Sequence, residues 1–86
     1  MAERFNVAKE VERSLDASRE HALRILPGLA GDLMADSDEV ALLELRNALA
    51  QHVLHRRAND DVANSVLAML RTHAMHKAAH FNHSAR

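Results

Sequence analysis

The sequence predicts an all-α protein, and three observations carry that prediction. The chain of 86 residues contains two glycines and one proline, all between positions 27 and 31, so helix-breaking residues are absent from the rest of it. Apolar residues recur three and four positions apart in three long segments. Opposite charges also stand three or four positions apart, as on the exposed face of a helix. We expect one domain over residues 1–86, folded as a three-helix bundle or as a helical hairpin with a long first helix.

The first predicted helix spans about residues 3–26. Val11 and Leu15 belong to an apolar face that keeps helical spacing over six turns, and Pro27 is expected to end the helix. Residues 27–36 then form a structured loop whose apolar side chains fold back onto the core.

The second predicted helix spans about residues 37–57. Asp36 is the expected N-cap, with Glu39 three positions later as in a capping box. The apolar positions that follow keep the spacing of a helix face that packs against a core. This core stripe consists of Leu42, Leu45, Leu49 and Val53.

The third predicted helix spans about residues 60–81, and residues 82–86 form a C-terminal tail. Asn59 is the expected N-cap, followed by two aspartates that the helix dipole favours in a first turn. Only a couple of residues join this helix to the second one. Such a short link favours an antiparallel hairpin.

The second helix has an apolar face wider than one partner helix covers. The core is expected to be thin, because 16 of the apolar residues of the chain are alanines. A chain of this size without disulfides is often stabilised by oligomerisation. We therefore expect the fold to be completed by a homodimer. The predicted interface residues are Leu43, Ala50, Leu54, Val7, Val11 and Phe81.

Four histidines, His73, His76, His80 and His83, fall within an arc of about 80° on the third helix. Imidazoles spaced three or four residues apart on a helix are typical Zn or Ni ligands, so these four are the candidate metal-binding residues. One straight helix cannot place all of them around a single ion. A metal site would therefore need further ligands from His52, from His55, or from a second chain.

The leading functional hypothesis is a non-catalytic protein–protein interaction module, acting as an adaptor, chaperone or regulatory partner. The chain has no cysteine, no glycine-rich phosphate loop and few aromatic residues, so we expect no enzyme and no small-molecule substrate. No apolar run reaches the length of a membrane span, which favours a cytoplasmic protein without a membrane partner. The alternatives are a metal-binding or metal-responsive protein that uses the C-terminal histidines, and a pH-gated helical interface.

Charge is unevenly distributed along the chain. Residues 1–39 hold 5 Lys and Arg against 9 Asp and Glu, whereas residues 40–86 hold 6 against 3, together with six of the seven histidines. This asymmetry favours an acidic partner or self-association with the acidic half of a second copy. A nucleic-acid-binding regulator is a weaker alternative, because the third helix begins with Asp60 and Asp61, which would repel DNA.

Overall fold

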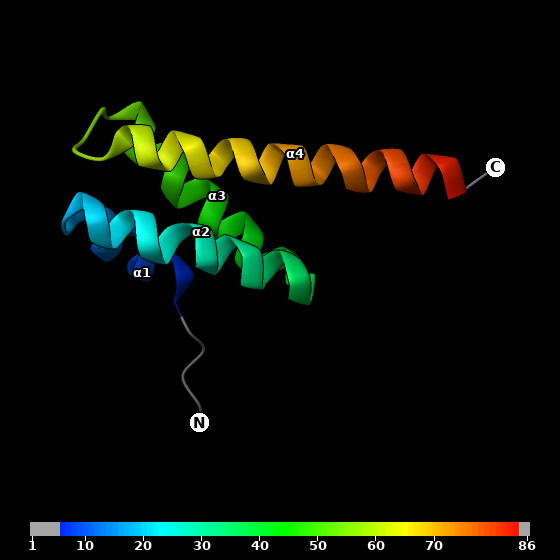
Figure 1. The fold of residues 1–86 in the computed structure, drawn as a ribbon, viewed down its shortest axis with the longest axis horizontal. Coiled ribbons are helices and arrows are strands. Elements are labelled where there is room, and N and C mark those ends of the chain that lie inside the picture. Colours follow the sequence, from blue (N-terminus) through cyan, green and yellow to red (C-terminus); the bar gives the residue numbers. More distant parts are fainter. Residues whose placement is uncertain (1–5, 85–86) are drawn as a thin grey trace, which may run out of the picture.

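The computed structural model describes the backbone of residues 6–84 and the side chains of residues 6–79. The part of the chain that it describes is an all-α globule of four helices, rather than a three-helix bundle or a hairpin (Figure 1). The helices are α1 (Val7–Asp16), α2 (Arg19–Asp36), α3 (Glu39–Leu54) and α4 (Asp60–Ser84).

The predicted long first helix is divided into two helices by a break at Ala17 and Ser18. The hydroxyl of Ser18 accepts a hydrogen bond from the backbone N–H of His21 at 3.1 Å, so Ser18 is the N-cap of α2. The chain folds back here because α1 and α2 then pack against each other and both bury their apolar faces. The helical spacing of charged and apolar residues continues across Ala17 and Ser18, so the sequence pattern did not indicate the break.

Pro27 lies inside α2, so the predicted loop over residues 27–36 is wrong and this segment is helical. Proline in a helix interior costs about 3 kcal/mol, because it removes one N–H donor and crowds the carbonyl four residues earlier. That carbonyl belongs to Leu23, whose side chain is 48% exposed, on a side of the helix that water reaches. Continuing the helix also buries Ala30 and Leu33, and burial of a leucine side chain contributes about 2 kcal/mol.

The junctions of α3 differ by a few residues from the expected ones. Ser37 adopts a left-handed conformation, with φ of 57°, and ends α2. Asp38 is the N-cap of α3, in place of the predicted Asp36, and its carboxylate accepts from the N–H of Ala41 at 3.1 Å. Asn59 precedes α4 as predicted, but its φ of 66° is not that of an N-cap, and its side chain donates to α1 instead.

The core lies among all four helices. Its position agrees with the predicted stripe on α3, except that Val53 is only partly buried. Small residues fill several buried positions, which lets the helices approach closely but leaves little apolar volume. The buried apolar residues are Val7, Val11, Leu15, Ala22, Leu26, Ala30, Leu33, Ala41, Leu42, Leu45, Leu49, Val62, Ala63, Val66 and Leu70.

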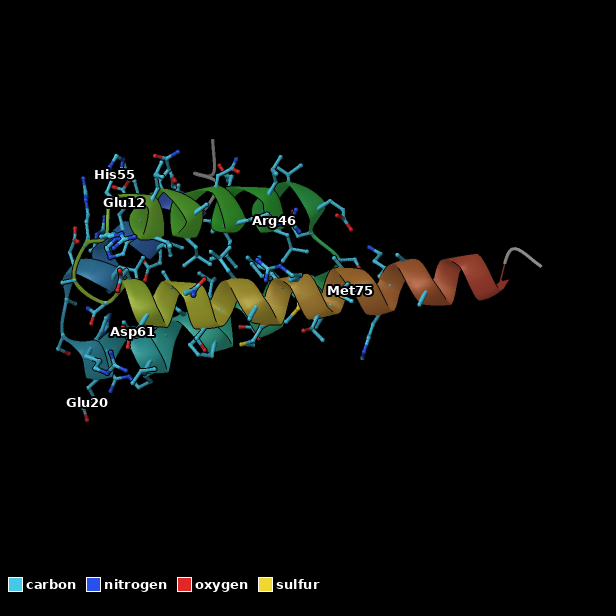
Figure 2. The ribbon with its side chains drawn as sticks, turned by 90° about the horizontal axis from the view of Figure 1, so that it is seen from above. Glu12, Glu20, Arg46, His55, Asp61 and Met75 are labelled. Atoms are coloured by element: carbon cyan, nitrogen blue, oxygen red, sulfur yellow. The ribbon has the colours of Figure 1, made fainter. Side chains whose placement is uncertain are left out.

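Helix α4 is the longest helix and lies across the rest of the molecule (Figures 1 and 2). It runs antiparallel to α3 and also packs against α2, and its C-terminal part projects beyond both of them. No helix in the described part of the chain combines the length and the apolar character that crossing a membrane requires. The projection of α4 leaves the surface between α3 and α4 open at one end.

Candidate protein-binding groove

A groove of about 290 Å³ runs along the surface between α3 and α4. A second hollow, of about 260 Å³, adjoins it and shares the side chains of Arg46 and Ala74. Together they follow α4 from Leu67 to Lys77, which at 1.5 Å per residue is about 15 Å, or nearly three helical turns. The larger hollow is lined by Glu39, Leu42, Leu43, Arg46, Leu70, His73, Ala74 and Lys77.

The floor of the groove is apolar because the apolar face of α3 is wider than the core. Leu42 is buried against the core, whereas Leu43, one residue further round the helix, is 54% exposed and lines the groove. On the opposite wall, Leu70 is buried and Ala74 presents only a methyl group. The short side chain of Ala74 keeps the groove open.

Positive charge lines both walls of the groove. Arg46 projects from α3 beside α4 (Figure 2), and Arg71 and Lys77 stand on α4. The one carboxylate in the lining belongs to Glu39, and it accepts a hydrogen bond from Lys77 Nζ at 2.5 Å. That hydrogen bond, together with the Lys77 charge, holds the pKa of Glu39 below its ordinary value, and His73 and Arg46 add smaller contributions.

The predicted interface residues fall into three groups. Leu43 lines the groove, and Ala50 and Leu54 are exposed on α3 outside it. Val7 and Val11 are buried in the core of the same chain, so neither is accessible to a partner. The side chain of Phe81 lies outside the described residues.

The histidines whose side chains the structure describes lie in different parts of the molecule. His73 lines the groove and His76 is exposed on the next turn of α4, while the side chains of His80 and His83 lie outside the described residues. Among the side chains that the structure describes, no group of three or more His, Cys, Asp or Glu residues is arranged to hold a metal ion. A metal site at the four histidines stays a prediction.

His52 and His55 lie at the other end of the helical hairpin and cannot complete such a site within one chain. His52 is buried, and its Nε2 lies 2.5 Å from the carbonyl oxygen of Ala58, in the α3–α4 loop. Asp60, where α4 begins, and His76 are separated along α4 by about 24 Å at 1.5 Å per residue. His52 and His55 could therefore serve as additional ligands only from a second chain.

Sequence reasoning did not identify the basic walls. Arg46 and Arg71 are 25 positions apart, and only the antiparallel register of α3 and α4 brings them to one groove. The available signal was the position of Arg46 between Leu43 and Ala50, three and four residues away, on the edge of the wide apolar face.

Comparison with known proteins finds no matching family model, no matching curated protein and no matching solved structure.

Proposed function

We propose that this protein is a non-catalytic interaction module and that the α3–α4 groove is its binding surface. The observation that carries the proposal is the apolar floor of the groove, with Leu43 54% exposed between two basic walls. Concave apolar surfaces flanked by charged side chains are typical sites of helix-in-groove recognition between proteins. The Glu39 carboxylate in the groove is engaged in an exposed ion pair with Lys77, and no Ser, Thr or Cys nucleophile lies in the lining, which favours binding over catalysis.

Site-specific photocrosslinking tests this proposal in the cells that make the protein. A photoreactive amino acid replaces Leu43 in the full-length chain, and in a second variant it replaces Val40. Val40 is the matched control, because it is an apolar residue on α3 that is 68% exposed and lies outside the groove. We expect a discrete protein adduct from position 43 and none from position 40. Equal labelling from both positions, or no adduct from position 43, would refute the proposal.

A second copy of the chain is the alternative partner, and a different surface favours it. An open hollow between α2 and α4 has no Asp, Glu, Lys or Arg in its lining, as is typical of the centre of a homodimer interface. It is lined by Met34, Ser65, Ala68, Met69, Thr72 and His73. Sedimentation equilibrium of the full chain, up to about 500 µM, decides whether the predicted homodimer forms.

Two variants test whether such a dimer forms through this α2–α4 surface. Met69→Glu places a charge in the hollow, whereas Met75→Glu places the same charge on an exposed part of the same helix outside the hollow. If the α2–α4 surface forms the interface, Met69→Glu weakens the dimer and Met75→Glu leaves it unchanged. A chain that remains monomeric over the whole concentration range excludes the homodimer, without affecting the crosslinking result at the groove.

A further inference from the structure

We infer that the α3–α4 groove binds an acidic amphipathic helix of another protein. The inference rests on the proposed function and adds the chemistry of the partner. Three properties of the groove lead to it: the apolar strip along its floor, the charge on its walls, and its length.

The floor fits the apolar stripe of a helix. Leu43 from α3 and Leu70 and Ala74 from α4 form this apolar strip, and Leu70 is buried where the strip meets the core. An incoming helix that places residues i, i+3, i+4 and i+7 on this strip buries apolar surface on both sides. A partner that binds as an added β-strand would instead require an unpaired strand edge, and the described part of the chain consists of helices and short links.

The charge on the walls determines the sign of the partner. Arg46 from α3 and Arg71 from α4 both line the second hollow. Neither arginine forms an ion pair with a carboxylate of this chain within the described residues, whereas Glu39 is occupied by Lys77. A helix in the groove therefore meets unpaired guanidinium groups on both flanks, and carboxylates beside its apolar stripe complement them.

The length of the groove sets the size of the partner segment. Leu67 and Lys77 bound the groove along α4, and their separation of ten residues corresponds to about 15 Å. A helix of about 11 to 14 residues spans this distance. The backbone of α4 continues beyond Ala78 to Ser84, whereas α3 begins at Glu39. The wall of the groove that α4 forms is therefore longer than the wall that α3 forms.

A folded second copy does not present the required helix. The acidic half of the chain lies mainly on α1 and α2, and the apolar faces of these two helices are already buried in the core through Val11, Leu15 and Leu26. The projecting part of α4, residues 78–84, contains no Asp or Glu. Among the described helices, α3 carries exposed apolar side chains together with carboxylates, but Glu39 is paired with Lys77 and Leu43 forms part of the groove itself, so the partner that we infer is a different protein.

Fluorescence anisotropy with synthetic peptides tests the inference on the full-length protein. The probe is a labelled peptide of about 14 residues, with leucines at i, i+3, i+4 and i+7, glutamates on both flanks of the leucine stripe and alanine elsewhere. One control peptide replaces every glutamate by lysine, and another keeps the composition but scrambles the leucine spacing. We expect the probe to bind about tenfold or more tightly than either control at low salt, and the preference over the lysine peptide to shrink at high salt.

Protein variants locate the binding in the groove. The double variant Arg46→Glu, Arg71→Glu is expected to lose about tenfold or more in affinity for the acidic probe and to gain affinity for the lysine peptide. Arg13→Glu, Arg24→Glu is the matched control, with the same change of net charge on exposed positions of α1 and α2, and its affinity should be unchanged within about twofold. All four positions are exposed, so circular dichroism should show the helical content of the wild type in both variants.

Several outcomes would overturn the inference. Equal binding of the scrambled peptide would show that charge alone drives association and that the groove does not recognise a helix stripe. Failure of every peptide, combined with a position-43 adduct in cells, would leave the proposed function intact but exclude this class of partner. An adduct of twice the 9.6 kDa chain mass would identify a second copy instead. Binding to anionic phosphatidylglycerol vesicles that requires Arg46 and Arg71, without peptide binding, would assign the groove to a membrane surface.

Discussion

Replacement of Asn59 probes the contact that holds the two halves of the fold together. Its side-chain amide nitrogen donates to the carbonyl oxygen of Leu15 at 2.7 Å and to that of Ala17 at 3.3 Å. Both carbonyls belong to the end of α1, where no further helical turn supplies a donor. Asn59 itself adopts φ of 66°, a left-handed conformation that asparagine tolerates better than most residues.

At Asn59 the structure separates two contributions to the free energy of unfolding: one from the hydrogen bonds of the side chain and one from the left-handed backbone conformation. Loss of the partly buried hydrogen bond to Leu15 costs about 1 to 1.5 kcal/mol, and the longer, exposed bond to Ala17 adds little. Alanine in a left-handed conformation costs about 1 kcal/mol more, whereas glycine has no such penalty. Asn59→Ala should therefore lower the free energy of unfolding by about 2 to 2.5 kcal/mol, and Asn59→Gly by about 1 to 1.5 kcal/mol.

Urea unfolding followed by circular dichroism measures both values. The expected losses are a large part of the total, since a domain of this size unfolds with about 4 to 13 kcal/mol. Asn64→Ala is the control, because Asn64 is exposed on α4 and its replacement should change the stability by less than about 0.5 kcal/mol. An Asn59→Gly variant as stable as the wild type would refute the role assigned to the side chain. Equal losses for Gly and Ala would refute the backbone contribution.

Three further predictions concern α2 and the ion pair between α2 and α4. Pro27→Ala should raise the free energy of unfolding by about 1 to 2 kcal/mol in urea titrations, because it restores a helical N–H donor; an unchanged midpoint would contradict this. Gly28→Ala and Gly31→Ala should each stabilise by up to about 1 kcal/mol, because an added methyl group meets nothing within 4 Å and neither φ is positive; destabilisation would show that the helix surface is not free. Arg19 forms an ion pair with Asp61 at 2.7 Å, and its hydrogen bond is the main cause of the lowered pKa of that carboxyl. A carboxyl with a lowered pKa stabilises the fold above its ordinary value of 3.8, and this stabilisation is lost as the pH falls through the lowered pKa. Arg19→Ala should thus raise the Asp61 pKa in an NMR titration, and its effect on stability should shrink below pH 3.8; a pKa that does not move would contradict the assignment.

The predicted helix boundaries were wrong where local preference and tertiary burial oppose each other. Pro27 is a strong local signal for a helix end, yet the buried positions Ala22, Leu26 and Ala30 continue a helical stripe on both sides of it. Conversely, no strong local signal marks Ala17 and Ser18, where the chain reverses. The reversal depends on Asn59, 42 residues from Ala17, whose side chain provides the donors that the end of α1 lacks.

The candidate site was only partly accessible to sequence reasoning. The excess apolar width of the second predicted helix identified Leu43, which the structure places on the open floor of the groove. The long apolar face of the first predicted helix led to the selection of Val7 and Val11, which are buried, because an apolar stripe looks the same whether it packs within the chain or against a partner. The basic walls were missed because a sequence pattern does not give the relative register of two helices.

By itself, the sequence determined the helical class, the α3 core stripe, the antiparallel link before Asp60 and the uneven distribution of charge. These properties follow from spacing and composition over neighbouring residues, which the chain carries in any conformation. Only the tertiary structure decided that Pro27 lies within a helix, that Ala17 and Ser18 form a corner, and that Arg46 and Arg71 line one groove. Those outcomes depend on burial and on hydrogen bonds between segments far apart in the chain, whose free energies exceed the local preferences that they oppose.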